Sequence, residues 1–364
     1  MSEQRNAHPY FMYEAIHLQP DRVAQVLDLR RDIIEQAAAA AASRQRILFL
    51  GIGTSYHAAL LGEQFLRHLT AGRARAQADT SFQFIHYPLE VGPGDAVVVV
   101  SHRGYKSYSV QAFERARAAG ALTIAVTGDA GSEKITGADF VIPTCEQENS
   151  FAHTKSFTAA LAALALFSIG VAERQGLASG ATDARAALLD MPARMREALR
   201  TEAAARETAN FIAERRQFVF LGAGPNWVTA MEAVIKVLET SYIPSTAAET
   251  EQFLHGPFSQ IDARAAIVAI LAGAPADARM TSLLEGVGAL GVARVVVATA
   301  GAGAAAPAER CIEVPAVAEW LSPLVLLIPL QLLCYYVALD RGANPDRGRQ
   351  NEIDHERAQK MFVL

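Results

Sequence analysis

Continuous apolar runs recur along the chain. ILFLGIG, DAVVVVS, LTIAVTG and DFVIPT carry apolar residues at nearly every position, and polar residues do not alternate with them. Such runs are typical of parallel strands that are covered on both faces. Stretches such as 110–119 lie between the runs and predict helices. Alternating strands and helices favour an α/β fold with a doubly wound parallel sheet.

The same pattern occurs twice. RILFLGIGTSY begins at Arg46 and QFVFLGAGPNW at Gln217, and the glycines Gly51 and Gly222 are 222 − 51 = 171 residues apart. LTIAVTG and ARVVVATAG align at the same offset, which indicates two copies of one α/β unit. We therefore expect two tandem doubly wound domains, at 46–175 and 206–340. A helical lead-in at 1–45 precedes them, a helical linker at 176–205 joins them, and a tail at 341–364 follows.

Composition excludes several classes of protein. The formal net charge is −5 and no basic stripe is present, so we expect no nucleic-acid partner. The apolar run 321–339 is long enough for a membrane helix, but Pro323, Pro329 and Gln331 favour a buried core helix and no membrane contact. The polar N-terminus and three cysteines without metal spacing indicate a cytoplasmic protein with buried thiols and no metal.

One helical stretch carries a charged stripe. Glu232, Lys236 and Glu239 are spaced i, i+4, i+7 and share one face of an otherwise apolar helix. Spacing alone favours a solvated row of ion pairs, while charges on an apolar helix are also what a catalytic site would require. A single histidine, His255, follows before Gly-Pro.

Four segments together resemble a known family. Residues 231–262 (MEAVIKVLETSYIPSTAAETEQFLHGPFSQID), 50–59 (LGIGTSYHAA), 148–160 (ENSFAHTKSFTAA) and 322–342 (SPLVLLIPLQLLCYYVALDRG) are similar to segments of the double SIS (sugar isomerase) domain family. The resemblance is to the isomerase half of glucosamine-6-phosphate synthase. It implies that Glu239 moves a proton between sugar C1 and C2, that His255 opens the ring, and that Lys236 supports the base.

The resemblance also implies a binding site for a sugar and its anionic group. The turn 51–55 would place a helix N-terminus on the anion, and its counterpart at Gly222 and Gly224 lacks the hydroxyl groups and would be structural. No cofactor is implied. The candidate binding residues are Gly53, Thr54, Ser55, Ser101, His102, Arg103, Gly104, Lys106, Glu148, Ala152, His153 and Arg349.

The chain departs from the family pattern at three places. The family's S-Q-S-G-E-T segment reads SHRGYK here, so Arg103 and Lys106 stand where hydroxyl groups usually bind phosphate. These side chains either bind the anion, which could then be phosphate, carboxylate or sulfonate, or extend into solvent. His153 replaces a serine, and Lys155 suits a structural role as well as ligand contact. Ile353 occupies the family's tail lysine position, and Lys360 lies seven residues further on.

These observations predict a phosphosugar isomerase or deaminase. The favoured reaction converts glucosamine-6-phosphate to fructose-6-phosphate and ammonia. Simple aldose–ketose isomerisation of another phosphate or sulfonate sugar is the close alternative, and a non-catalytic sugar-phosphate sensor is a third. No glutaminase half is expected, because no domain precedes residue 45. The family's histidine enters from a neighbouring subunit, which implies a homodimer with shared sites in a cleft between the two halves.

Overall fold

The computed structural model describes residues 5–87, 89–129, 131, 133–178, 181–350 and 352–362. The chain divides into two compact units, each made of separate stretches of sequence. The first-sheet unit comprises 18–148, 153–192 and 353–364, and the second-sheet unit comprises 1–17, 149–152 and 193–352. Helix α1 (Phe11–Leu29) and helix α7 (Ala181–Ala198) each pass from one unit to the other.

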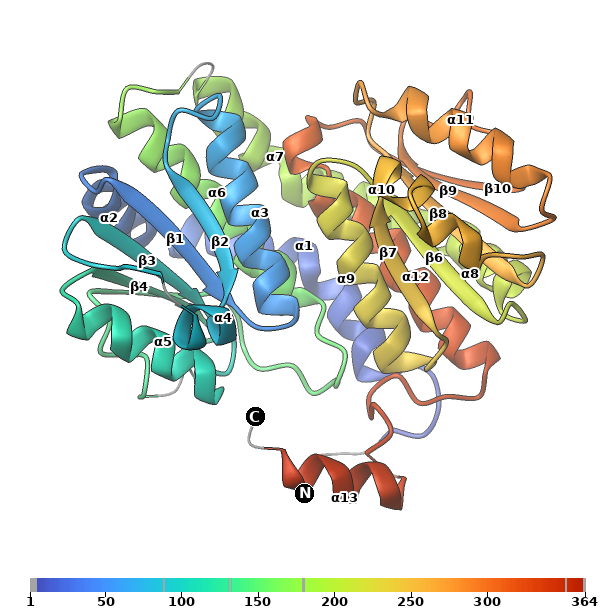
Figure 1. Cartoon of the computed structure of the whole chain (residues 1–364), viewed down its shortest axis with the longest axis horizontal. Helices are drawn as coiled ribbons and strands as arrows, with labels where there is room; N and C mark the ends of the chain where they lie inside the picture. The colour runs from blue at the N-terminus through green and yellow to red at the C-terminus, as the bar shows by residue number, and fades with distance from the viewer. Residues whose placement is uncertain are drawn as a thin grey trace. The chain divides into compact units, whose positions relative to one another are not determined.

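The first-sheet unit contains a five-stranded parallel sheet in the order β2-β1-β3-β4-β5. Phe84 and Phe113 belong to helices α4 and α5 and pack against Leu50 and Val97 of the sheet, while α2, α3 and α6 lie together on the other face (Figure 1). The strands are β1 Arg46–Gly51, β2 Ala76–Thr80, β3 Asp95–Val100, β4 Leu122–Thr127 and β5 Phe140–Pro143. The helices are α2 Arg31–Ala42, α3 Thr54–Leu69, α4 Ser81–His86, α5 Ser107–Ala118, α6 Lys155–Arg174 and α13 Ile353–Met361.

The second-sheet unit repeats this arrangement. Its parallel sheet has the order β7-β6-β8-β9-β10, which is the first sheet's order in the second copy. Two tandem doubly wound α/β units are therefore confirmed. The strands are β6 Gln217–Gly222, β7 Ser245–Glu249, β8 Ala265–Leu271, β9 Ala293–Thr299 and β10 Arg310–Val314. The helices are α8 Glu202–Ile212, α9 Pro225–Thr240, α10 Thr250–Leu254, α11 Asp277–Gly288 and α12 Pro323–Asp340.

Both copies turn from the first strand into the next helix in the same way. A Cβ atom on Gly51 would lie 2.2 Å from Ser55 O, and one on Gly222 would lie 2.1 Å from Asn226 O. Gly53 (φ 58°) and Gly224 (φ 52°) then adopt left-handed backbone conformations that favour glycine. The turn that the sequence predicts is therefore required sterically in both repeats.

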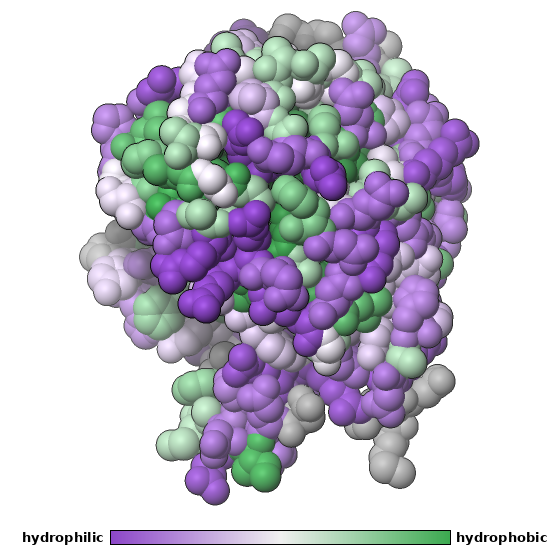
Figure 2. Space-filling view, turned by 90° about the vertical axis from the view of Figure 1, so that its right-hand side faces the viewer, coloured by the Kyte–Doolittle hydropathy of each residue, from purple (hydrophilic) through white to green (hydrophobic). Residues whose placement is uncertain are grey.

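Two helices are long and apolar enough to cross a membrane by length and composition, Lys155–Arg174 and Pro323–Asp340. Their most apolar windows are 94% and 89% buried within the protein, respectively, as a core helix requires. Figure 2 shows one face of the molecule, where hydrophobic residues form patches interrupted by hydrophilic ones. The expectation of buried thiols holds for Cys145 and Cys334 but is wrong for Cys311, which is exposed on the edge strand β10.

Helices occupy the stretch that the sequence predicts as a linker. Helix α7 ends at Ala198, a short 3₁₀ turn covers Leu199–Thr201, and α8 begins at Glu202. The start of α1 is capped by Asp346, whose two carboxylate oxygens accept hydrogen bonds from Phe11 N (2.8 Å) and Met12 N (2.9 Å). The first turn of α1 is therefore fixed to the tail segment of the second-sheet unit.

Candidate functional site

The charged stripe on α9 is buried. Lys236 is 0% exposed, and its Nζ lies 2.7 Å from Glu239 Oε2 and 3.3 Å from Glu232 Oε1. Glu232 is also 0% exposed, while Glu239 retains 24% exposure. A solvated row of surface ion pairs is therefore not what the structure contains. Burying a lysine between two carboxylates is costly unless the charges stay paired, and Glu239 is the member of the trio that reaches solvent.

Helix α12 packs against α9 beside the two fully buried members of this stripe, Glu232 and Lys236. Cys334 Sγ lies 3.7 Å from Ala233 O, and burial raises the pKa of the Cys334 thiol to about 12. Thr240 Oγ1 donates to Lys236 O at 2.7 Å and holds the last turn of the helix. The Cys334 thiol therefore stays neutral at physiological pH and adds no charge beside Glu232 and Lys236.

His255 lies on the surface of the second-sheet unit. It follows α10, which Glu249 caps by accepting hydrogen bonds from Glu251 N and Gln252 N. The ring is 69% exposed, and its Nε2 lies 3.2 Å from Glu251 Oε1. Arg279 Nε holds the same carboxylate at 2.6 Å. In this chain the imidazole therefore contacts Glu251, and it is accessible from outside.

In the first-sheet unit, two loops lie side by side at the carboxyl ends of the strands. Strands β1 and β3 are neighbours, and their carboxyl ends continue into the turn at 51–55 and into the β3 loop, residues 101–106. Ser55 is half-buried in the first turn of α3, and Ser101 is buried. Gly104 has a left-handed φ of 68°. The structure thus brings together the two segments in which the sequence predicts anion binding.

The β3 loop carries two cations without a carboxylate partner among the described residues. Arg103 Nη1 donates to Tyr105 Oη at 2.9 Å, and Lys106 is the residue that precedes the first turn of α5. A lysine at a helix N-terminus is unfavourable, because that end carries partial positive charge from its free N–H groups. An anion held between Arg103 and Lys106 would offset this accumulation of positive charge.

In the second copy, a carboxylate of the chain supplies negative charge at the equivalent position. Asp277 occupies the position of Lys106 in the β8 loop, residues 272–277, since 277 − 106 = 171. Asp277 Oδ2 accepts hydrogen bonds from Ala272 N (3.1 Å), Gly273 N (2.7 Å) and Ala274 N (3.1 Å). Burial raises the pKa of Asp277, while these three N–H groups act in the opposite direction.

A second carboxylate lies beside the glycine turn of this copy. A Cβ atom on Gly224 would lie 3.2 Å from Glu319 Oε1, and Pro225, which follows, has no N–H to donate. Burial, followed by the nearby charge of Asp277, raises the pKa of Glu319. The second-copy turn faces the chain's own acidic groups and is unsuited to an external anion.

Glu148 organises the segment before α6. Burial opposes its ionisation, but His153 and hydrogen bonds from Ser156 and Thr154 hold its pKa below the usual value. Its Oε1 accepts from Ser156 N at 2.8 Å, and both oxygens lie 2.9 Å from Thr154 N. Glu148 therefore acts as a carboxylate cap for the N-terminus of α6.

Lys155 forms an ion pair with Glu146, which the sequence analysis did not single out. Glu146 also accepts two hydrogen bonds from Arg22, at 2.7 and 2.8 Å. Burial opposes ionisation of Glu146, but Arg22 and Lys155 lower its pKa to about 2. This contact supports the structural role of Lys155.

The tail contributes Arg349 to the second-sheet unit. Its guanidinium lies 4.4 Å from the centre of the Tyr242 ring, and the backbone N–H of Arg349 donates to Tyr242 Oη at 3.0 Å. A Cβ atom on Gly348 would lie 2.3 Å from the Phe151 ring, so only glycine fits where the tail crosses the segment that contains buried Ala152. Both packing contacts fix the position of Arg349.

Beyond Arg349, most of the described tail residues are exposed. Ile353, which occupies the position of the family lysine, is 76% exposed at the start of α13. Lys360 pairs with Glu356 at 2.6 Å on the same helix.

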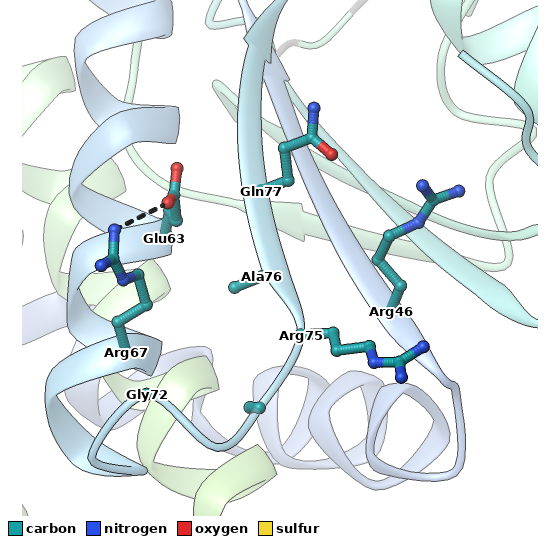
Figure 3. A pocket seen from close by; sticks show the side chains of 8 residues that line it. Arg46, Glu63, Arg67, Gly72, Arg75, Ala76 and Gln77 are labelled. Atoms are coloured by element: carbon teal, nitrogen blue, oxygen red, sulfur yellow. Dashed lines mark hydrogen bonds and ion pairs between the residues drawn. The ribbon is translucent and has the colours of Figure 1, made fainter.

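A hollow of about 340 Å³ lies at the other end of the first sheet, beside β2. Figure 3 shows Arg67 and Glu63 on one side of β2 and Arg46 and Arg75 on the other. Arg46 begins β1, so this hollow lies at the amino ends of the strands and away from the β3 loop. Arg46 is held by Asp95 at 2.9 Å and Arg67 by Glu63 at 3.3 Å. The hollow is separate from the candidate site.

Metal-binding clusters are not found among the described residues. The comparison with protein families shows that the SIS domain matches residues 41–169 and 211–341. The chain belongs to the SIS domain family. The two matches correspond to the two repeats, and the family resemblance of the sequence is confirmed.

Curated relatives are larger than this chain. This chain is 29% identical over 349 residues to a protein of Thermococcus kodakarensis named glutamine–fructose-6-phosphate aminotransferase (isomerizing). The aligned region covers 95% of this chain and 58% of the relative. This SIS protein therefore spans little more than half the length of that relative.

Solved structures share the fold. The C-terminal domain of glucosamine-fructose-6-phosphate aminotransferase from Francisella tularensis has a TM-score of 0.85 at 21% identity, covering 94% of this chain and 99% of that one. Glucosamine-6-phosphate deaminase from Thermotoga maritima has a TM-score of 0.73 at 20% identity, covering 93% and 97%.

Proposed function

We propose that this SIS protein is a phosphosugar isomerase that binds a hexose through an anionic group at C6. The observation that carries the proposal is the β3 loop. Its cations Arg103 and Lys106 lack a carboxylate partner among the described residues, whereas the β8 loop fills the same position with Asp277. One copy supplies its own anion, and the other is arranged to take an anion from a ligand.

The buried stripe supports a proton-transfer reaction. Glu239 takes the proton from C2 of the open-chain aldose as the C1 carbonyl oxygen gains one, which gives an enediol. Return of a proton to C1 and loss of the C2 hydroxyl proton produce the ketose. The adjacent Lys236 Nζ, at 2.7 Å, stabilises the carboxylate form of Glu239 before it takes the proton and after a proton has returned to C1.

Release of ammonia is the finer proposal. If C2 carries an amino group, the same proton transfers pass through an enolamine and give an imine at C2. Water adds to that carbon and ammonia leaves, which yields the ketose phosphate. The structure named as a glucosamine-6-phosphate deaminase supports this reading through its shared fold. Simple isomerisation is the alternative, and a non-catalytic sensor is disfavoured by the buried Glu232–Lys236–Glu239 trio.

A homodimer with shared sites is part of the proposal. His255 contacts Glu251 and is 69% exposed, which suits a histidine that acts on a ligand bound by another subunit. A ring-opening histidine must reach the sugar oxygen directly, within about 3 Å.

The test is an assay panel. Glucosamine 6-phosphate, glucose 6-phosphate and glucose 6-sulfonate are each incubated with the protein, and ketose and ammonia are measured separately. Ketose with equal ammonia supports deamination, and ketose alone supports isomerisation. Binding of these sugars without any turnover supports the sensor, and absence of both binding and turnover would reject the proposal.

A further inference from the structure

His102 is held firmly in the β3 loop by its backbone. Its carbonyl oxygen accepts hydrogen bonds from Gly128 N (2.9 Å), Thr127 Oγ1 (3.2 Å) and Gln147 Nε2 (3.2 Å). A Cβ atom on Gly128 would lie 2.8 Å from His102 Cε1, so the ring fits only because residue 128 is glycine. The position of the imidazole is therefore built into the fold.

Both ring nitrogens of His102 are buried, and neither has a hydrogen-bond partner in the described part of the chain. Folded proteins pair nearly all buried polar atoms, and exceptions are concentrated at sites that bind something. The β3 loop around this ring otherwise has the two cations Arg103 and Lys106. A ligand held by those cations would bring further polar groups close to His102.

A second imidazole lies against the first. The rings of His102 and His153 are 5.5 Å apart and nearly perpendicular, at 88°. Ser156 Oγ donates to Glu148 Oε1 at 2.5 Å, because an ionised carboxylate only accepts. Ser156 has one hydroxyl proton, so its oxygen accepts from His153 Nδ1 at 3.2 Å. This chain of bonds fixes the His153 ring that packs against His102.

Burial favours the neutral form of His102. Burial, which is the largest effect, lowers the pKa of His102; Arg103 and Lys155 act in the same direction, and Glu148 and Asp129 oppose it. A neutral imidazole offers one donor and one acceptor. A hydroxyl group is also both donor and acceptor, whereas a phosphate oxygen only accepts. The ring is therefore matched to a sugar hydroxyl better than to the anion.

We propose that His102 is a specificity-determining residue that binds one hydroxyl group of the sugar, next to the anionic group held by Arg103 and Lys106. This inference rests on the proposed function, because it requires a C6-anionic sugar in the β3 loop. It assigns different tasks to neighbouring residues of one loop: the cations hold charge, and the histidine distinguishes sugars that carry the same charge.

The experiment compares His102→Ala and His102→Gln with the parent protein, using a hexose 6-phosphate from the assay panel and its 2-, 3- and 4-deoxy analogues. His86→Ala, which changes an exposed histidine on α4, is the matched control. His102→Ala should weaken binding of the parent sugar phosphate roughly 3- to 10-fold, the value of one net hydrogen bond, and raise KM more than it lowers kcat. His102→Gln, which keeps a donor and an acceptor, should recover most of the loss.

The deoxy analogues separate recognition from structure. For one analogue, the parent protein and His102→Ala should bind equally, because the hydroxyl that pairs with the ring is already missing. Affinity for inorganic phosphate should be unchanged by His102→Ala. If His102→Ala weakens all analogues and phosphate alike, or weakens none, the proposal is overturned and the ring is structural or bound to water. If no hexose 6-phosphate binds even the parent protein, the proposed function fails first.

Should His102→Ala fail to fold, labelled imidazole NMR on the unaltered protein gives the same answer. The His102 ring signals should shift with a hexose 6-phosphate and remain in place with inorganic phosphate. Equal shifts with both ligands would contradict hydroxyl recognition.

Discussion

Lys106 and Asp277 occupy the same position in the two repeats and carry opposite charges. Each lies where a loop enters a helix, α5 in one copy and α11 in the other. Asp277 accepts three backbone N–H groups, whereas Lys106 adds positive charge to a helix end that is already positive. The duplicated loop has therefore diverged into one form that supplies its anion and one that lacks it.

Removing the internal carboxylate should destabilise the second-sheet unit. Asp277→Ala leaves the N–H groups of residues 272–274 without their acceptor, and we expect a loss of about 1–3 kcal/mol in the free energy of unfolding. Asp277→Asn keeps an oxygen acceptor and should lose less. Denaturant unfolding measures both variants, and equal stability of Asp277→Ala and the parent would contradict the role given to this side chain.

Glu239→Gln should abolish most of the turnover. The amide keeps the size of the side chain but cannot accept the C2 proton, so kcat should fall by roughly 10²- to 10⁴-fold while the protein stays folded. Glu285→Gln, on the exposed face of α11, is the matched control and should retain full activity. Near-normal turnover by Glu239→Gln would remove the base from the mechanism.

The cations of the β3 loop should determine KM. Arg103→Ser removes a charge-assisted hydrogen bond worth about 1.5–3 kcal/mol, so KM should rise roughly 10- to 150-fold. Arg75→Ser, which changes a residue of the hollow at the amino ends of the strands, should leave KM unchanged. Calorimetry with phosphate and sulfonate sugars checks both. If Arg103→Ser binds every sugar as tightly as the parent and Ser55→Ala does not, the turn at 51–55 holds the anion without the guanidinium.

Shared sites should be detectable by mixing inactive proteins. Glu239→Gln and His255→Ala are each expected to be inactive alone, while hybrid dimers contain one site with both intact residues. Activity should return in part after subunit exchange, which mass spectrometry of isotope-labelled subunits would verify. No recovery after proven exchange, or full activity of a monomer, argues against the shared site.

Glu146 should stabilise the first-sheet unit in a pH-dependent way. Arg22 and Lys155 hold its pKa at about 2 in the folded state, against 4.5 ordinarily. Because the folded pKa is depressed, the stabilisation is fully present above about pH 4.5 and is lost as the pH falls toward 2. The difference in unfolding free energy between the parent and Glu146→Gln should shrink over that window. A difference that stays constant would show that ionisation of Glu146 is not involved.

The sequence predicts the central strands of the first sheet and its edge strand β5, but it does not predict the edge strands β2 and β7. Continuous apolar runs identify β1, β3 and β4 because these strands are covered on both faces. The edge strands β2 and β7 read AQADT and STAAE and are mostly half-buried, so no apolar pattern distinguishes them from loops. The sequence predicts a buried Cys311 because cysteine is usually buried, yet this residue is exposed on the edge strand β10.

Site residues were predicted by resemblance, whereas their partners were not. The stripe on α9 could be found by helical spacing, but its burial depends on α12, about a hundred residues away. Glu146 carries no local signal, because it lies in the segment between β5 and α6 and its partners Arg22 and Lys155 belong to helices α1 and α6. The sequence alone is enough to align Asp277 with Lys106, because the two residues are separated by the repeat offset.

The cap that Asp346 provides to α1 has a consequence for protein synthesis. Phe11 N and Asp346 Oδ2 are separated by 335 positions along the chain. At the usual rate of translation of about 5–20 residues per second, the start of α1 waits roughly 15–70 s for its acceptor to emerge from the ribosome. During that interval the N–H groups of Phe11 and Met12 lack the carboxylate that caps them in the folded protein. The second-sheet unit, though it contains the N-terminus, is therefore completed only when the tail has been made.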